Sequence, residues 1–427
     1  MSAYPAKRIR HLFECCDGRR IPLNAEERST KRGEVPYWGA NSIVDFVDEA
    51  LFDEELVLLG EDGAPFQDRD RPKAFCVKGP VWPNNHIHVL RPFADTHARF
   101  MAYAMNHIDY SLYIDGSTRD KLTQSAMNDI KLPCPPVREQ TRIANFLDEQ
   151  TARIDALIAE KERLDGLLGA YRSSLISAAV TGRLDVETGA VVPTEGGATG
   201  HRKTDDTTVQ TTRWPRVALK RVANSAETLF TDGDWIEAPY ITLEGIRLVQ
   251  TGNIGVGHYK EQGYRYVSEK TFEELNCTEV YAGDLLVCRL ADPVGRACLA
   301  PDLGARMITS VDNCIVRPNL REWNIHYLNY SLSGDEYLQG LEAMARGGTR
   351  DRVSRSMLGD VQIAKPPLAD QTRIANFLDD QTVRVDALRK HCREHITLLR
   401  EYRSSLISAA VTGRLNVDSF GREVVQA

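Results

Sequence analysis

A short segment whose composition suits contact with phosphate occurs twice in the chain. It reads Gly-Ser-Thr-Arg-Asp-Lys at residues 116–121 and Gly-Gly-Thr-Arg-Asp-Arg at residues 347–352. We expect each copy to lie at the start of a short helix, where free backbone N–H groups and the helix dipole favour an anion, with Arg119 and Arg350 adding positive charge. The alternative is a helix N-cap, formed by a hydroxyl residue of the segment beside a solvated arginine.

The chain carries no motif that assembles a catalytic site. The sequence has no P-loop, no H-E-x-x-H, no G-x-S-x-G and no Asn/Asp-Pro-Pro-Tyr/Phe motif of an amino-methyltransferase. Its nine cysteines include no C-x-x-C pair, and its ten histidines are dispersed. We therefore expect no catalytic residue, no metal site and no cofactor bound by this chain, which would bind and position other molecules.

A longer repeat follows each of these segments. Residues 135–186 and 366–417 align without a gap at an offset of 231 positions, and 34 of the 52 aligned residues are identical. The phosphate-type segments keep the same offset, whereas the residues before them are far less alike. The chain is therefore two dissimilar units, each followed by nearly the same sequence.

Each repeat predicts one long helix. A double proline precedes it, an acidic residue lies in its first turn, and Gly182 or Gly413 follows it as a C-cap glycine. Apolar residues fall on heptad positions along both copies. The expected a positions are Leu147, Ile154, Leu168 and Leu175 with Leu378, Val385, Cys392, Leu399 and Leu406, and the expected d positions are Leu157, Leu164, Tyr171 and Ala178 with Leu388, Tyr402 and Ala409.

Such an apolar stripe needs a partner, and the other helix is the nearest one available. The predicted fold class is therefore α+β, with two globular α+β domains separated by an antiparallel coiled coil of two long helices and related by an internal pseudo-two-fold. The expected boundaries are a first domain at 1–134, a helix at 135–186, a linker at 187–212, a second domain at 213–365, a helix at 366–417 and a tail at 418–427.

Identity within the repeat is concentrated at the two ends of the helices. It vanishes across nine consecutive residues in the middle, 158–166 against 389–397. The ends keep even polar residues unchanged, including Arg142 and Arg373. Two identical surfaces on one chain favour two copies of one partner. The alternative, a recent duplication without selection, would leave the flanking units equally alike.

The repeated motif Pro-Pro-x-x-(Glu/Asp)-Gln-x-x-Ile-Ala-x-Phe-Leu-Asp, leading into a helix that ends Thr-Gly-Arg-Leu, resembles the DNA-specificity subunit of type I restriction–modification systems. The resemblance covers essentially the whole chain, although the two domains match more loosely, through stretches such as 35–41 and 283–286. It implies two target-recognition domains that each read one half of a split, asymmetric site in double-stranded DNA. It also implies a subunit that is not itself an enzyme.

The resemblance further implies partners. Two copies of a DNA methyltransferase (modification) subunit would dock on the conserved helices and methylate adenine with S-adenosylmethionine, and restriction subunits that use ATP and Mg²⁺ to translocate DNA would join them. No cofactor is implied for the specificity chain itself. The implied partner-binding residues, at the ends of the helices, are Gln140, Arg142, Ile143, Phe146, Arg172, Gln371, Arg373, Ile374, Phe377 and Arg403.

Recognition domains of this family have no residue-level code, so the candidate DNA contacts rest on chemistry. Arginine and lysine suit phosphate and guanine, asparagine suits adenine, and aromatic rings suit apolar contact. The first-domain candidates are Arg19, Arg20, Lys31, Arg32, Trp38, Asn41, Arg119 and Lys121, and the second-domain candidates are Tyr240, Arg247, Arg289, Arg296, Arg350 and Arg352.

Composition bounds the remaining possibilities. A formal net charge of −7 argues against a protein that coats nucleic acid regardless of sequence. Reduced thiols, the absence of an apolar leader and the absence of a membrane-length apolar run predict a soluble cytoplasmic protein. The open alternatives are a coiled-coil adaptor that does not touch DNA, and the specificity chain of a methylation-only or type II-like system.

Overall fold

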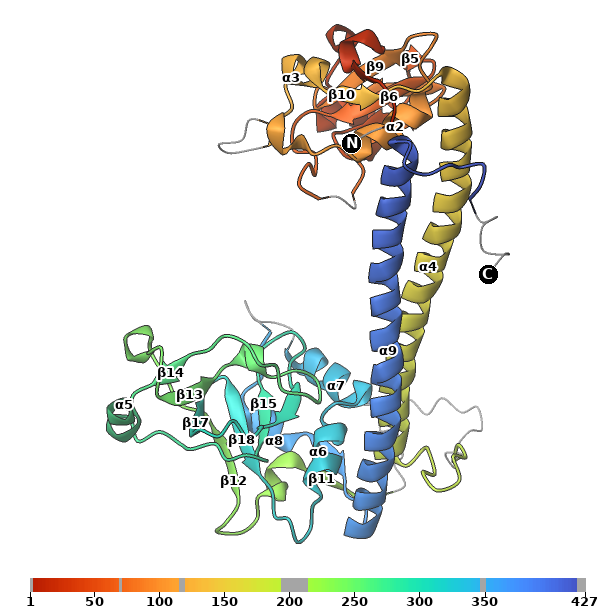
Figure 1. Cartoon of the computed structure of the whole chain (residues 1–427). Coiled ribbons are helices and arrows are strands. Elements are labelled where there is room, and N and C mark those ends of the chain that lie inside the picture. The colour runs from red at the N-terminus through yellow and green to blue at the C-terminus, as the bar shows by residue number, and fades with distance from the viewer. Residues whose placement is uncertain (1–2, 69–70, 115–119, 193–213, 346–350, 421–427) are drawn as a thin grey trace. The chain divides into compact units, whose positions relative to one another are not determined.

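The computed structural model spans residues 1–427 and describes residues 3–68, 71–114, 120–192, 214–345 and 351–420. Spatial contacts divide it into two compact units. Unit 1 is Met1–Arg163 with Cys392–Ala427, and unit 2 is Leu164–His391. Each unit holds one α+β domain together with part of both long helices, as Figure 1 allows the reader to follow.

The domain of unit 1 is built on two four-stranded sheets and one strand pair. Strand β6 (Leu56–Gly60) is buried at every residue. A continuous apolar run of this kind suits an inner strand of a sheet that is covered on both faces. The antiparallel sheet has the order β2 (Phe13–Cys15), β9 (Ile87–Pro92), β6 and β7 (Ala74–Val77). The second sheet has the order β4 (Ile43–Val47), β3 (Arg32–Trp38), β8 (Pro80–Pro83) and β5 (Phe52–Asp53), and β1 (Ala6–Arg8) pairs with β10 (Lys131–Pro133).

The domain of unit 2 repeats this topology with different residues. Its antiparallel sheet has the order β12 (Leu229–Asp232), β18 (Asn313–Arg317), β15 (Leu285–Cys288) and β16 (Ala297–Leu299). A second sheet has the order β14 (Tyr266–Val267), β13 (Ile246–Val249) and β17 (Met307–Thr309), and β11 (Arg216–Ala218) pairs with β19 (Gln362–Ala364). In both units one parallel pair joins the second sheet, β3 with β8 and β13 with β17.

Short helices complete the two domains. Unit 1 has α1 (Ala25–Thr30), α2 (Ala98–Asn106) and α3 (Gln124–Asp129), with 3-10 turns η1 (Ile9–His11), η2 (Asp17–Arg19) and η3 (Tyr110–Leu112). Unit 2 has α5 (Glu269–Glu274), α6 (Ile325–Ser331), α7 (Asp335–Ala345) and α8 (Arg355–Asp360), with 3-10 turns η4 (Leu219–Val222), η5 (Ala238–Tyr240) and η6 (Thr251–Asn253). None of the helices in the described part of the chain combines the length and the apolar character that a membrane crossing requires.

The repeats form the two long helices that the sequence predicts, α4 (Val137–Thr181) and α9 (Leu368–Val411). Both end at the expected glycine, because Gly182 and Gly413 adopt left-handed φ values of 75° and 73° that suit a residue without Cβ. Within unit 1 the start of α4 packs against the end of α9, and within unit 2 the end of α4 packs against the start of α9. The antiparallel pairing and the α+β fold class are thus confirmed.

The buried seam of this coiled coil differs from the predicted one. The expected a positions are buried except Leu168 and Leu399, which are half-buried, whereas the expected d positions Leu157, Tyr171, Leu388 and Tyr402 are 48–53% exposed. The other half of the seam is formed by the position after d. Its buried members are Thr151, Ile158 and Ala179 on α4 and Thr382, Ile396 and Ala410 on α9. Buried residues recur every seven positions, as predicted. The prediction that d is the second buried position of each heptad was wrong, because the buried position is the one after it.

Ion pairs across the seam show the internal symmetry directly. In unit 1, Arg403 Nε lies 2.8 Å from Asp155 Oδ1, and in unit 2 the equivalent Arg172 Nε lies 3.1 Å from Asp386 Oδ1. These residues differ in number by the repeat offset of 231. Each pair joins the start of one repeat to the end of the other. The part of the coiled coil in unit 1 and the part in unit 2 therefore present equivalent surfaces.

A buried glutamine fixes the start of each long helix. In unit 1, Gln140 is fully buried, its Nε2 donates to Pro135 O at 2.8 Å, and its Oε1 accepts from the backbone N–H of His97 at 2.9 Å. In unit 2, Gln371 is equally buried and makes the corresponding bonds to Pro366 O and the N–H of Asn324 at 2.9 and 2.8 Å. Both side chains are structural anchors of the fold.

We expect Gln140→Ala and Gln371→Ala each to lower the free energy of unfolding by about 2 kcal/mol, because backbone groups that were paired become buried and unsatisfied. Urea unfolding of the full chain measures the change. Asn145→Ala, at an exposed position of the same helix, is the matched control and should change stability little. Equal losses in the control and the glutamine variants would contradict the anchoring role.

Candidate nucleic-acid interface

The recurring basic segments occupy the same place in both domains. In unit 1, the N–H of Gly63 donates to Asp120 O at 3.2 Å and the N–H of Leu122 donates to Glu61 O at 2.8 Å. In unit 2, the N–H of Ala291 donates to Asp351 O at 3.1 Å and the N–H of Val353 donates to Arg289 O at 3.1 Å. The described end of each segment therefore runs along the residues that follow the central strand, β6 or β15.

The basic residues of these segments are placed only in part. Lys121 is half exposed, with Nζ 3.5 Å from Glu61 Oε1, and Arg352 is similarly exposed, with Nη2 2.9 Å from Asp312 Oδ1. Arg119 and Arg350 lie outside the described residues. Both described cations are exposed enough to reach a phosphate while an acid on the adjacent loop holds them.

The helix that follows each segment begins later than expected. Thr123 caps α3 by accepting from the N–H of Ala126, and Ser354 caps α8 by accepting from the N–H of Met357. The described helices after the two segments therefore begin at Gln124 and Arg355. The predicted helix start at the Gly-x-Thr-Arg sequence itself lies outside the described residues.

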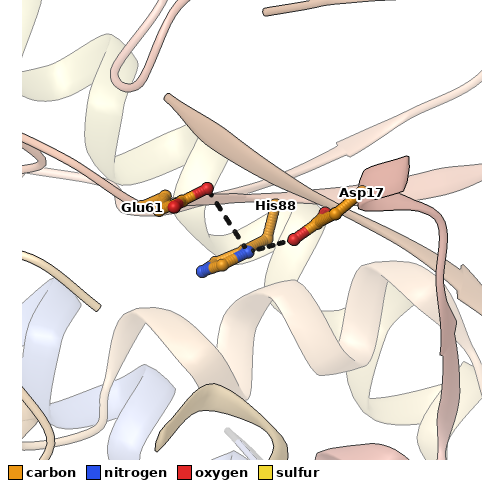
Figure 2. Close-up of side chains that lie close together, drawn as sticks. All are labelled: Asp17, Glu61 and His88. Carbon is orange, nitrogen blue, oxygen red and sulfur yellow. Dashed lines mark hydrogen bonds and ion pairs between the residues drawn. The ribbon is translucent and has the colours of Figure 1, made fainter. Parts of the chain in front are cut away.

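A buried charged cluster, three of whose side chains are drawn in Figure 2, is in contact with Lys121 at the described end of the first segment. His88 is fully buried, its Nδ1 lies 2.6 Å from Asp17 Oδ2, and its Nε2 lies 2.9 Å from Leu122 O. Glu61 completes the cluster, with Oε2 3.8 Å from His88 Nδ1 and 2.6 Å from Nη1 of Arg20. The cluster joins η2, β9 and the residue after β6 to the segment itself.

The cluster has the bonding of an ion-pair network. Burial raises the pKa of Asp17, but bonds from His88, from the N–H of Val89 and the charge of Arg20 outweigh it and lower the pKa below the usual value. Three carboxylate and imidazole residues at this spacing could in principle hold a metal ion. Here both oxygens of Asp17 already accept bonds, and Glu61 is paired with Arg20, so these groups satisfy one another.

Three of the second-domain candidates are buried and do not face solvent. Arg247, Arg289 and Arg296 are 2%, 4% and 7% exposed. The guanidinium of Arg296 donates to the carbonyl oxygens of Thr251, Ile254, Leu290 and Pro293, and that of Arg247 donates to those of Gln262, Gly263 and Arg265. The prediction that these arginines contact DNA is therefore withdrawn, because their guanidinium groups are buried and bonded within the domain.

The remaining first-domain candidates lie at or near the surface. Arg19 is exposed over the ring of Phe52, Lys31 is bound to Glu49, and Arg32 is exposed. Arg20 is mostly buried in the cluster of Asp17 and Glu61. Trp38 and Asn41 are half-buried, and Tyr240 at the end of η5 is also half-buried.

Some surface residues of the second domain were missed by sequence reasoning. Trp235 is 69% exposed, Tyr264 61%, Tyr281 54% and Leu243 93%. Large apolar side chains on loops suit contact with base edges or sugars. Composition alone could not separate them from core residues, because the same large apolar residue types fill the core.

The expected partner-binding residues fall into two groups. Gln140, Gln371, Ile143 and Ile374 are at most 2% exposed, so their direct contact with a partner is withdrawn. Arg172 and Arg403 are engaged in the inter-helix ion pairs described above.

The other members of the set lie at the ends of the helices. Arg142 is bound to Glu139 and, at 2.9 Å, to Asp418, whereas Arg373 is bound to Asp370 and, at 3.1 Å, to Glu187. Phe146 and Phe377 are half-buried, and Phe146 packs edge-on against Phe420. The segment that follows each helix thus binds the start of the other helix at equivalent positions.

One side of the coiled coil remains apolar and exposed in each unit. Leu157 and Tyr402 are 51% and 48% exposed in unit 1, and their counterparts Leu388 and Tyr171 are 53% and 52% exposed in unit 2. All four immediately precede a seam position, so in an antiparallel pair they flank the same side of the seam. The opposite side carries the ion pairs of Asp155, Glu162 and Asp386.

Comparison with known proteins agrees with these features. Residues 1–164 match the family model described as type I restriction modification DNA specificity domain. A Haemophilus influenzae protein named as a type I restriction enzyme specificity subunit is 24% identical over 366 residues, which are 81% of this chain and 80% of that protein. The EcoKI specificity subunit of Escherichia coli is 20% identical over 341 residues, or 77% of this chain and 68% of that protein.

The fold also has a solved counterpart. A chain from a structure titled for complex assembly and conformational transition of the type I R-M system superposes with a TM-score of 0.68 at 16% identity, covering 96% of this chain and 98% of that chain. At this identity the likeness establishes the fold alone. The family model and the sequence relatives confirm the resemblance that the repeated helices indicate.

Proposed function

We propose that this chain, a relative of type I restriction–modification specificity subunits, recognises a bipartite site in double-stranded DNA and carries two methyltransferase subunits to it. One observation carries the proposal: two domains of the same topology but dissimilar sequence are each joined to an equivalent end of one coiled coil. A shared scaffold with different surface residues suits two readers of different sequences. The comparisons support the DNA-specificity role of the first domain.

The equivalent ends of the coiled coil support two docking surfaces for one kind of partner. Surface A is Leu157 with Tyr402, and surface B is Leu388 with Tyr171, each within one unit. Half-exposed leucine and tyrosine beside a helix seam suit an apolar helix or loop of a partner. Each methyltransferase subunit would bind one surface, and restriction subunits would join through the methyltransferases.

The chain itself has no catalytic role in this proposal. S-adenosylmethionine would be bound by the methyltransferase subunits, and ATP and Mg²⁺ by the restriction subunits. The complex would act in the cytoplasm, on the DNA of the cell and of incoming phage. The continuous helices α4 and α9, of roughly 45 residues and about 66 Å each, would set the length of the unread spacer between half-sites.

The test is binding to the chain's own site. Sequencing modified adenines in host DNA gives both half-sites and the spacer, and fluorescence anisotropy then measures the affinity of the complex for that duplex. We expect affinity to fall by about a thousandfold between roughly 50 and 200 mM salt, as several phosphate contacts require. Scrambling either half-site should cost several kcal/mol of binding free energy.

Substitution separates this function from a coiled-coil adaptor that does not touch DNA. Arg119→Ala, Arg350→Ala, Lys121→Ala and Arg352→Ala should each reduce the salt slope by about one, and a pair with one change in each domain by about two. Lys270→Ala, which removes an exposed lysine outside the recurring segments, is the control. Salt-independent binding, or none to the mapped duplex, would favour the adaptor.

A further inference from the structure

In each domain a buried cation contacts the residue that directly follows the recurring segment, but this cation comes from a different strand in each domain. In unit 1 the cation is His88 on β9, whose Nε2 lies 2.9 Å from Leu122 O. In unit 2 it is Arg289, the residue after β15, whose Nη1 donates to Val353 O at 3.3 Å. Leu122 and Val353 are equivalent positions of the repeat, directly after Lys121 and Arg352.

The pairing of the strands identifies which residues of the two domains are equivalent. Leu59 pairs with His88 in unit 1, and Val287 pairs with Cys314 in unit 2, so His88 and Cys314 are equivalent. The same register aligns Glu61 with Arg289. On the neighbouring strand, Cys15 pairs with Leu90 and Phe230 pairs with Val316, which aligns Asp17 with Asp232.

The acid is therefore retained while the cation has moved to the adjacent strand. Asp17 accepts from His88, whereas Asp232 Oδ1 lies 3.3 Å from Arg289 Nε and 3.2 Å from the sulfur of Cys314. In both domains a buried positive group spans the distance from this acid to the carbonyl oxygen of the residue that directly follows the recurring segment. Different sequences thus make the same connection, which indicates that the connection itself is required.

We propose that His88 and Arg289 are positioning residues, which hold the recurring segments where Lys121 and Arg352 can contact DNA phosphates. The inference rests on the proposed function and deepens it. His88 can donate to both Asp17 and Leu122 only as the doubly protonated imidazolium, because both ring nitrogens face acceptors.

The two connections are independent of each other. The charged groups around His88 are Asp17, Arg20, Glu61 and Lys121, all of the first domain. Replacing His88 removes the donor to Leu122 O and leaves the bond from Arg289 to Val353 O in place. Each substitution should therefore weaken the hold on one segment only.

Hydrogen exchange of the free full-length chain tests the positioning without DNA. We expect His88→Gln to increase amide exchange about tenfold in peptides that contain Leu122 and to leave peptides that contain Val353 unchanged. Arg289→Gln should give the reverse pattern, and Arg289→Lys should restore part of the protection. His86→Gln is the matched control, since His86 lies two residues away, is 45% exposed and faces Asp62. Equal exchange at Leu122 in the wild type and His88→Gln would overturn the proposal.

Binding to a random-sequence duplex of about forty base pairs then tests the consequence, because phosphate contact does not depend on sequence. We expect His86→Gln to bind like the wild type, and His88→Gln and Arg289→Gln each to bind severalfold more weakly. Wild-type affinity in His88→Gln would refute the role of His88. A wild-type chain that binds no duplex would instead refute the proposed function. Should His88→Gln fail to fold, equal exchange at Val353 in the wild type and in Arg289→Gln still overturns the inference.

Discussion

A chain carrying Leu157→Asp and Tyr402→Asp should bind one methyltransferase subunit in place of two. Both side chains belong to surface A and are about half exposed, so aspartate at these positions is solvated in the free chain. In a docked complex the same carboxylates would be buried against an apolar partner surface without a counter-charge. Truncating a central apolar contact costs 2 kcal/mol or more, and a buried unpaired charge costs more still. We expect at least about a thousandfold weaker docking at surface A.

The equivalent pair on surface B gives an internal control. Leu388→Asp with Tyr171→Asp should also leave one bound subunit, and all four changes together should leave none. Native mass spectrometry of the co-expressed complex counts the subunits directly. Glu149→Ala with Arg153→Ala removes an exposed ion pair of α4 and should retain two. Retention of two subunits after all four changes would exclude these surfaces, and loss of both after either pair would exclude independent docking.

The long helices could be predicted because their signal is local and repeated. A double proline, an uninterrupted heptad and a terminal glycine act within one segment, and two copies reinforce each other. The side of the helix that is buried was harder to predict. Asp165 and Arg389 occupy seam positions and pair with each other at 2.8 Å, so each looks like a solvated charge until its partner is known. The leucines at d looked like the seam and are exposed instead.

The candidate site depends on contacts that no local pattern reveals. The carbonyl oxygens around Arg296 come from residues that lie up to 45 positions away in the sequence, and an arginine alone reads as a surface residue. The common topology of the two domains was likewise hidden, because β-strand pairing preserves the positions of Asp17 and Asp232 while the cation changes from His88 to Arg289. Strand register, which the sequence does not state, was needed to compare them.

Removing one heptad from both long helices should shorten the recognised spacer by about three base pairs. Deleting Ala159–Asp165 from α4 and Lys390–Ile396 from α9 takes out two turns of each helix, or about 10 Å of rise, against 3.4 Å per base pair. The heptad phase continues across both junctions, and the ion pairs Asp155–Arg403 and Arg172–Asp386 keep their partners. Methylation should persist on a new site with unchanged half-sites, because neither domain is altered.

The position of the seam allows a better choice of the deleted residues in α9. The deletion above removes Asp165 but leaves Arg389, which would lose its partner within the seam. Moving the second deletion by one residue, to Arg389–His395, removes both members of the pair and still keeps the heptad phase. Deleting a heptad from α4 alone is the control, since it offsets the two helices and should abolish site-specific methylation. Sequencing of modified adenines reads out the spacer in every case. A spacer of the original length in the doubly shortened chain would mean that the coiled coil does not measure the distance, and that DNA distortion or the partner subunits set it instead.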